Sequence, residues 1–167
     1  FKNAIVEYKN IYDIKYKNKF DFVFSIGVIH HLEFPKKAIK NLIKSLKKNG
    51  TLLIWVYGYE GNEWIVNYIN PIRKITSRLP VSLTHMIAYL FSVPLWLFIK
   101  ILKPESGYLN QLSKFKFKHV HSIVFDQLLP RIANYWTKEE AKNLLEDLNN
   151  VKIYHVNNNS WTVVGRK

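Results

Sequence analysis

Residues 20–58 read FDFVFSIGVIHHLEFPKKAIKNLIKSLKKNGTLLIWVYG, and this stretch decides the fold. Its first part, 21–26, is a short apolar run rich in β-forming residues that ends at Gly27. Pro35 then opens a segment whose apolar residues recur at helical spacing, followed by a second apolar run over 51–57. The helical apolar residues are Ile39, Leu42, Ile43 and Leu46. The order strand, helix, strand predicts a right-handed crossover between two parallel strands.

The same stretch predicts where the helix ends and where a ligand binds. Asn49-Gly50 follows the helical pattern, and glycine accepts the left-handed conformation that a C-terminal cap needs. Ligands of parallel sheets bind beyond the carboxyl ends of the strands. Loops 25–32 and 57–62 leave the two predicted strands at that edge. We therefore expect the polar and aromatic side chains of these loops to form a site.

The composition indicates a folded chain with a basic surface. The chain has 167 residues, of which 48% are hydrophobic and 15% aromatic, enough for a core of its own. It contains no cysteine, which excludes disulfides and thiolate metal sites. The net charge of +13 has two explanations, solvated lysine faces or an anionic partner such as nucleic acid or lipid. The wide spread of the lysines favours the first explanation.

Three pieces of the opening stretch resemble class I S-adenosylmethionine (SAM)-dependent methyltransferases. Asp21, His30-His31-Leu32 and Lys48-Asn49-Gly50 match the surroundings of the fourth and fifth strands of that family. The resemblance covers residues 4–58 and 130–167. It implies an α/β fold with a Rossmann-like methyltransferase sheet, SAM as the cofactor and methyl transfer as the activity.

The glycine-rich cofactor loop of that family has no counterpart in this sequence. The glycines are scattered and form no GxGxG pattern. We therefore expect a partial methyltransferase domain over 1–167, incomplete at its N-terminus and forming the C-terminal part of a longer enzyme. We also expect this chain alone to bind SAM weakly or not at all. A non-catalytic truncated remnant is the alternative.

The expected sheet contains five strands, the last two of which form an antiparallel hairpin like the sixth and seventh strands of the family. These strands are 3–8, 21–26, 51–57, 151–156 and 161–166. Before the hairpin, Thr137 and Glu140 have the spacing of a helical capping box. One apolar helical face follows, made of Ala141, Leu144, Leu145 and Leu148.

The resemblance also implies cofactor contacts in two places. The first is the end of the third strand of the family, where Asn10 would contact the adenine amino group and Ile11 would pack against the ring. The alternative is that Asn10 is simply a turn residue. The second place is the loop after 21–26, where the methionine part would lie along Ser25, Ile26, Gly27 and Val28.

Two histidines are the candidates for catalysis. His30 and His31 could act as a general base, since an imidazole titrates near neutral pH. Alternatively, they orient the loop by hydrogen bonding. The candidates for the acceptor pocket follow 51–57, and they could instead pack a lid against the core. They are Tyr57, Tyr59, Glu60 and Trp64. No metal site is predicted, because His119, His121 and Asp126 have no known ligand spacing.

Residues 62–136 are expected to form a mainly helical insertion before the C-terminal hairpin, acting as a lid. Its apolar run 86–102 is interpreted as a buried helix pair, because it is short for a membrane span and interrupted by Pro94 and Lys100. Three of its side chains should then be mostly buried, namely Leu95, Trp96 and Phe98. Peripheral membrane contact through 86–102 is the alternative. The expected localisation is cytoplasmic, with membrane association if that alternative holds.

The apolar lid favours a small-molecule or lipid-like acceptor. A nucleic-acid acceptor is the alternative, supported by the charge and by alternating lysine and phenylalanine over 114–118. Enzymes that methylate exocyclic base amines carry an Asn-Pro-Pro-aromatic motif where this chain has 25–28, which reads Ser-Ile-Gly-Val. A small-molecule acceptor is therefore the expected partner, and nucleic acid is not.

Overall fold

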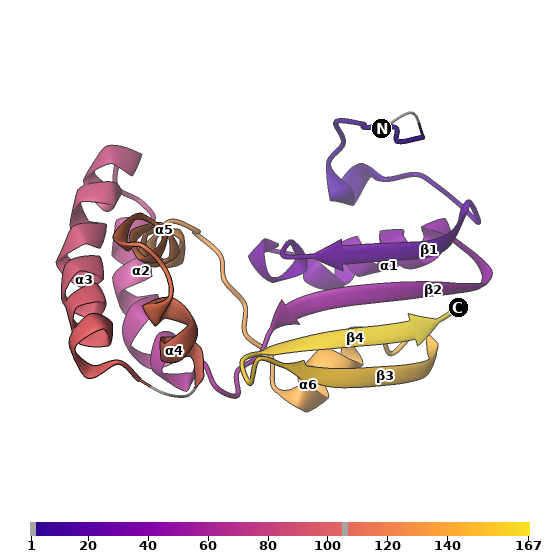
Figure 1. Cartoon of the computed structure of the whole chain (residues 1–167). Coiled ribbons are helices and arrows are strands. Elements are labelled where there is room, and N and C mark those ends of the chain that lie inside the picture. Colours follow the sequence, from indigo (N-terminus) through magenta and orange to yellow (C-terminus); the bar gives the residue numbers. More distant parts are fainter. Residues whose placement is uncertain (1–2, 105–106) are drawn as a thin grey trace. The chain divides into compact units, whose positions relative to one another are not determined.

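The computed structural model describes residues 3–104 and 107–167, and the chain divides into two compact units. Unit 1 comprises Phe1–Gly61 and Asn134–Lys167, and unit 2 comprises Asn62–Ala133. The strands lie in unit 1, whereas unit 2 is helical (Figure 1).

Within the described residues, unit 1 contains a four-stranded sheet in the order β1-β2-β4-β3 (Figure 1). The strands are β1 (Phe20–Ile26), β2 (Leu46–Tyr57), β3 (Asn149–Val156) and β4 (Ser160–Arg166). β1 and β2 are parallel, with Ser25 opposite Ile54, and the other two pairs are antiparallel. The predicted parallel crossover and C-terminal hairpin are therefore confirmed, and with them the Rossmann-like α/β fold class.

Two helices cover one face of this sheet. They are α1 (Pro35–Ser45) and α6 (Lys138–Asn143). Alternate residues of β2, namely Leu52, Ile54 and Val56, are fully buried against them. The other buried residues of this core include Ile39, Leu42, Ala141, Leu144, Leu145, Leu148, Trp161 and Val163. The predicted apolar helical face thus lies in the core, as its spacing indicated.

The capping box at the start of α6 is present as predicted. The Thr137 hydroxyl accepts a hydrogen bond from the Glu140 backbone N–H at 3.3 Å. In return, the Thr137 backbone N–H donates to the Glu140 carboxylate at 2.9 Å. Each side chain therefore satisfies a backbone donor that the first helical turn leaves unpaired.

The predicted strand over 3–8 is wrong. Residues 4–10 have no regular structure, and Ile5, Val6 and Tyr8 are at least 90% exposed. The following residues form a short 3-10 helix, η1 (Ile11–Asp13). A strand needs a neighbour to complete its ladder of hydrogen bonds, so a high β propensity alone does not create one.

The helix α1 ends earlier than its sequence predicted. It stops at Ser45, and β2 begins at Leu46, four residues before Gly50. The backbone N–H groups of Asn18 and Lys19 donate to the carbonyls of Lys44 and Ser45. A neighbouring segment thus satisfies the carbonyls of the last turn, so a glycine cap is not needed there.

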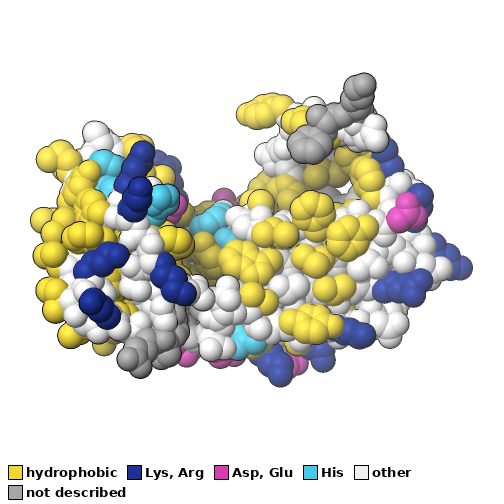
Figure 2. Space-filling model, viewed as in Figure 1, with side chains coloured by type: hydrophobic (Ala, Val, Ile, Leu, Met, Phe, Trp, Pro, Cys, Tyr) yellow, Lys and Arg dark blue, Asp and Glu magenta, His cyan; other side chains and the backbone are white. Residues whose placement is uncertain are grey.

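The opposite face of the sheet is exposed at β1. Phe22, Phe24 and Ile26 share this face and are each more than 50% exposed. Figure 2 shows the resulting hydrophobic surface over the strands. Continuous apolar runs are typical of strands covered on both faces, whereas helices cover only one face of this sheet among the described residues.

Unit 2 is built from one long helix and several short ones. Its elements are the π-helix η3 (Ile65–Ile69), α2 (Asn70–Thr76), α3 (Val81–Leu102), α4 (Gly107–Ser113) and α5 (Phe117–Leu128). A small core between α3, α4 and α5 contains Ile99, Leu112 and Val120. The function of this unit as a lid stays a prediction.

The apolar run forms one helix, α3, rather than the predicted pair. Pro94 lies inside it without ending it. Leu95 and Trp96 are half-buried, whereas Phe98 is 48% exposed, so the predicted burial of Phe98 is wrong. By length and composition alone, α3 is long and apolar enough to cross a membrane, and only 17% of its most apolar window is buried. Peripheral membrane contact stays a prediction.

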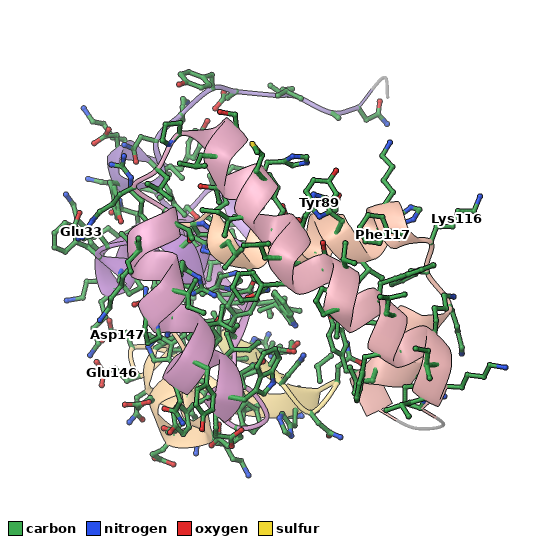
Figure 3. All side chains as sticks on the ribbon, turned by 90° about the vertical axis from the view of Figure 1, so that its left-hand side faces the viewer. Glu33, Tyr89, Lys116, Phe117, Glu146 and Asp147 are labelled. Atoms are coloured by element: carbon green, nitrogen blue, oxygen red, sulfur yellow. The ribbon has the colours of Figure 1, made fainter. Side chains whose placement is uncertain are left out.

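A histidine and aromatic cluster holds α3 against α5. The His121 ring bonds the Ser92 hydroxyl at 2.8 Å and the His85 ring at 3.1 Å. Tyr89 stacks on His121 with ring centres 4.0 Å apart. In Figure 3, Tyr89 and Phe117 lie side by side while Lys116 points away. Burial lowers the pKa of His121, and the nearby His85 acts in the same direction.

Candidate functional site

The carboxyl ends of β1 and β2 lie side by side in unit 1. Ile26, the last residue of β1, pairs with Trp55 near the end of β2. Gly27 then turns the chain with φ +76°, a left-handed conformation that favours glycine. The 3-10 helix η2 (Ile29–His31) follows directly. The two predicted site loops therefore start from one edge, as the parallel arrangement required.

An aromatic cluster forms at this edge. The His30 ring stacks on Tyr57 with ring centres 3.6 Å apart and planes 19° apart. Tyr57 also stacks with Tyr135, with ring centres 5.4 Å apart and planes 23° apart. His31 and Trp55 approach the same group edge-on, at 5.7 Å from Tyr57 and 5.6 Å from His30 respectively. The structure thus brings together three predicted site residues, His30, His31 and Tyr57.

Sequence reasoning missed the segment that completes this cluster, Asn134-Tyr135-Trp136. The Asn134 backbone N–H donates to the His30 carbonyl at 2.8 Å, and its side chain donates to the Leu32 carbonyl at 2.9 Å. Trp136 forms a parallel bridge with Gly58, which extends the edge of β2. The available signal was an amide and two aromatic residues placed immediately before the capping box.

His30 is neutral at physiological pH. It is 1% exposed, and this burial, with His31 beside it, lowers the pKa of His30 to about 3. A histidine with so low a pKa is a weak base near pH 7. Its Nδ1 is buried and has no hydrogen-bond partner among the described residues. The catalytic roles of His30 and His31 stay predictions, and the half-buried His31 is the better placed of the two for proton transfer.

The predicted methionine-side residues follow the end of β1. Ser25 is buried, whereas Ile26 and Val28 are 59% and 44% exposed. A Cβ added to Gly27 would meet no atom within 4 Å, so the backbone there is open on that side. Contact of Ser25, Ile26, Gly27 and Val28 with the methionine part of the cofactor stays a prediction.

The predicted adenine-side residues lie next to the start of α1. The Asn10 side chain accepts from the Tyr12 backbone N–H at 3.0 Å and so caps η1, as in the turn alternative. The Tyr12 hydroxyl accepts from the Phe34 backbone N–H at 3.1 Å. The side-chain amide of Asn41, in α1, donates to the Tyr12 carbonyl of η1 at 2.9 Å. Contact of Asn10 and Ile11 with adenine stays a prediction.

The other predicted acceptor residues are placed differently from one another. Tyr59 is 37% exposed after β2. The Glu60 carboxylate accepts from the Lys138 backbone N–H at 2.9 Å, at the start of α6. Burial acts to raise the pKa of Glu60, but hydrogen bonds, first that from Lys138, outweigh it, and this pKa lies below its ordinary value. Trp64 belongs to unit 2, where it is 55% exposed.

Asn134 is expected to hold the histidine loop in place. Replacing Asn134 by alanine removes the side-chain hydrogen bonds to the His30 and Leu32 carbonyls. We expect the free energy of unfolding to fall by about 1 kcal/mol and the amides of η2 to exchange faster with solvent. Urea unfolding and hydrogen exchange measure these changes. The exposed Asn143→Ala variant is the control, and equal effects of both variants would contradict this role for Asn134.

Comparisons with known proteins agree with the fold and identify relatives. Residues 3–54 match the family described as "Methyltransferase domain". A tRNA U34 carboxymethyltransferase of Sulfurimonas denitrificans is 38% identical over 50 residues, which are 30% of this chain and 17% of that protein. A protein of the same name from Helicobacter pylori is 38% identical over 55 residues, or 21% of its length. The matched stretch thus spans about a fifth of these relatives.

Two solved structures share the fold. A SAM-dependent methyltransferase of Thermotoga maritima aligns with 99% of this chain and 65% of its own, with a TM-score of 0.52 and 14% identity. A methyltransferase of Bacillus halodurans aligns with 95% of this chain and 69% of its own, with a TM-score of 0.50 and 11% identity. The resemblance to class I SAM-dependent methyltransferases is confirmed, and this chain has part of their fold.

The expected acceptor is wrong. The curated relatives are named for a tRNA nucleotide. These names contradict the expected small-molecule or lipid-like acceptor. They also contradict the expectation that nucleic acid is not a partner. The missing Asn-Pro-Pro-aromatic motif bears only on enzymes that modify exocyclic base amines. It was therefore too narrow a ground for setting aside nucleic acid as a class.

Proposed function

We propose that this chain takes part in the SAM-dependent transfer of a carbon group to tRNA. The observation that carries the proposal is the similarity to relatives named tRNA U34 carboxymethyltransferase. The match to a methyltransferase domain over residues 3–54 supports it, because that range contains β1, α1 and most of β2. The group moved is a methyl group if SAM itself is the donor, whereas transfer of the carboxymethyl group of the relatives' name needs a SAM derivative that carries this group on its sulfonium centre.

The strand edge fits a cofactor of the SAM type. The open backbone at Gly27 leaves room for its methionine part along Ser25, Ile26 and Val28. The buried Nδ1 of His30 offers an unused hydrogen-bonding atom at the same edge. The cofactor supplies an electrophilic carbon on a sulfonium centre. The contribution of the chain is to hold the two reactants in line, which is where most of the rate enhancement of a displacement arises.

The aromatic cluster suits a nucleobase as acceptor. Tyr57 and Tyr135 are both half-buried, so each keeps part of its ring accessible. Single-stranded RNA bases stack on such rings, and base–aromatic stacking contributes about 1–3 kcal/mol per base. The half-buried His31 lies 5.7 Å from Tyr57, centre to centre, where it could accept a proton from an acceptor base. The net charge of +13 attracts the RNA backbone.

The proposal is tested by following a labelled carbon group. The protein is incubated with tRNA, duplex DNA or phospholipid vesicles and with methyl-labelled SAM or a SAM derivative carrying a labelled carboxymethyl group, at a donor concentration high enough to offset the weak SAM binding expected of this chain. We expect label in the tRNA, sensitive to ribonuclease. Tyr135→Ala should weaken tRNA binding about five- to a hundredfold, because it removes a stacking surface.

The control for this variant is Tyr154→Ala, since Tyr154 is 53% exposed on β3 and is not part of the aromatic cluster. It should bind tRNA like the unchanged protein. Label that enters lipid or DNA in preference to tRNA would refute the proposal. Equal losses of tRNA binding in the two tyrosine variants would refute the role of the cluster.

A further inference from the structure

Unit 2 carries nearly half of the net positive charge of the chain. Between residues 62 and 133 the sequence has nine lysines and arginines but three acidic residues, a net charge of +6. Figure 2 shows several of these basic side chains on one face of the molecule. The ion pairs seen among the described residues join Lys9 to Glu7, Lys36 to Glu146 and Lys47 to Asp21, all in unit 1. None of these ion pairs among the described residues therefore involves Lys74, Arg78 or Arg131 of unit 2.

Part of this charge surrounds an open pocket of about 380 Å³. The pocket is lined by Lys74, Ser77, Arg78 and Arg131. The first three come from the end of α2 and the residues after it, and Arg131 follows the end of α5. The three basic side chains are exposed and Ser77 is half-buried, so a ligand can reach all four from solvent.

Buried hydrogen bonds hold the walls of this pocket together. Arg73, 4% exposed, donates to the Gln127 carbonyl at 2.6 Å and to the Asn70 side chain at 2.7 Å. The Thr76 hydroxyl donates to the Leu128 carbonyl at 2.8 Å. Thr84 of α3 donates to the Thr76 carbonyl at 2.8 Å. The ends of α2 and α5 are thus fixed to each other, which preorganises the pocket at little entropic cost on binding.

The positive charge of the pocket is uncompensated. Among the described residues, no carboxylate lies within ion-pair distance of Lys74, Arg78 or Arg131. Three cations around one hollow repel each other, and an anion bound between them removes that repulsion. Two guanidinium groups, an ammonium group and a hydroxyl are the donors that proteins use for phosphate.

We propose that this pocket binds a phosphate group of an RNA backbone. The assignment to RNA, rather than to another phosphate, rests on the proposed tRNA acceptor. The two arginines would donate paired N–H groups to phosphate oxygens, Lys74 would add a point charge, and the Ser77 hydroxyl would donate one hydrogen bond. Such contacts hold the register of a nucleic acid without reading its sequence.

A second basic segment of unit 2 agrees with a nucleic-acid partner. Lys114, Lys116 and Lys118 alternate with Phe115 and Phe117 around the start of α5. Arg131 follows the opposite end of this helix, which has 12 residues and is therefore about 18 Å long. A strand of RNA could thus meet basic groups at both ends of α5, as in proteins that combine phosphate contacts with aromatic stacking.

The test compares two triple variants with the same loss of charge. One variant removes the pocket cations, K74Q/R78Q/R131Q, and the control removes exposed lysines of unit 1, K40Q/K44Q/K48Q. Binding of fluorescent tRNA is measured by anisotropy between roughly 50 and 200 mM salt, a range over which affinity that rests on phosphate contacts falls steeply. We expect the pocket variant to bind about ten- to a hundredfold more weakly. In the pocket variant, the slope of the logarithm of the association constant against the logarithm of the salt concentration should be smaller in magnitude by about one.

We expect the control to lose less than about threefold in affinity, since it removes charge without removing a site. Equal losses in both variants would show that only the total charge matters and would overturn the pocket. Unchanged tRNA binding by the pocket variant would also overturn the phosphate site. In that case the proposed function would still stand if the unchanged protein transferred label to tRNA. Conversely, absence of label transfer to tRNA by the unchanged protein would refute the proposed function.

A second measurement separates RNA from other sources of phosphate. Inorganic phosphate, titrated at constant ionic strength, should shift the amide NMR signals of Ser77 and Arg78 in the unchanged protein and not in the pocket variant. Absence of that shift would overturn the anion site. If the pocket variant lost binding to phosphatidylglycerol vesicles but kept tRNA binding, the site would belong to a lipid surface and the RNA assignment would be wrong.

Discussion

Replacement of Gly61 by alanine is expected to lower the free energy of unfolding of unit 1 by about 3–5 kcal/mol. Gly61 ends the first segment of unit 1 and has φ +81°. An added Cβ would lie 1.8 Å from the Asn158 carbonyl oxygen, a backbone atom that cannot rotate away. The variant therefore adds the cost of a left-handed backbone to that of a severe clash with the hairpin turn between β3 and β4.

The matched control is Gly27→Ala. Gly27 has nearly the same conformation, φ +76°, but an added Cβ there meets nothing within 4 Å. It should cost only the conformational strain, about 1–2 kcal/mol. Hydrogen exchange of the β2 amides reports on unit 1 alone and gives both values. Similar losses in the two variants would show that the approach of Asn158 to Gly61 is not the source of the effect.

A fall in pH from 7 to 4 is expected to destabilise unit 1 through His30 by about 3 kcal/mol. Burial lowers the pKa of this histidine from 6.5 to about 3 in the folded state. Between these two values the unfolded chain binds a proton that the folded chain refuses. Stability is therefore unaffected above about pH 6.5, falls as the pH decreases through this window and levels off below about pH 3.

His30→Gln should remove most of this dependence, because glutamine keeps a polar side chain at the site but does not titrate. Urea unfolding at pH 7, 5 and 4 should show the two proteins diverging by about 2 kcal/mol at pH 5 and about 3 kcal/mol at pH 4. Groups remote from His30 contribute the same pH dependence to both proteins and cancel in the difference. Parallel curves for the two proteins, or an NMR titration of the His30 ring near pH 6.5, would contradict the burial of this side chain.

The sequence alone predicted the features that depend on neighbouring residues. Alternating apolar periods predicted β1, α1 and β2, and the spacing of Thr137 and Glu140 predicted the start of α6. The hairpin is likewise local, since Asn157 and Asn158 both have positive φ, as its tight turn requires. Each of these interactions joins residues a few positions apart, so their pattern can be read along the chain.

Other features were decided by contacts between distant parts of the chain. Ile5 and Val6 have strand propensity but no strand beside them, so they stay exposed. α3 continues past Pro94, and its residue Ile99 beyond that proline is buried in a core shared with α5. A propensity is a small energy per residue, and pairing or packing with a distant segment outweighs it.

The candidate site also combines features that the sequence predicted with features that depend on contacts between distant residues. The loops that carry His30 and Tyr57 could be placed at one strand edge from sequence, because parallel strands bring their carboxyl ends together. The stacking of those rings, the depressed pKa of His30 and the contribution of Tyr135 could not. Tyr135 follows Tyr57 by more than 70 positions in the sequence, and the residues of unit 2 come between them along the chain. Only the folded chain places it on the ring of Tyr57, because burial and ring stacking depend on which distant residues pack together.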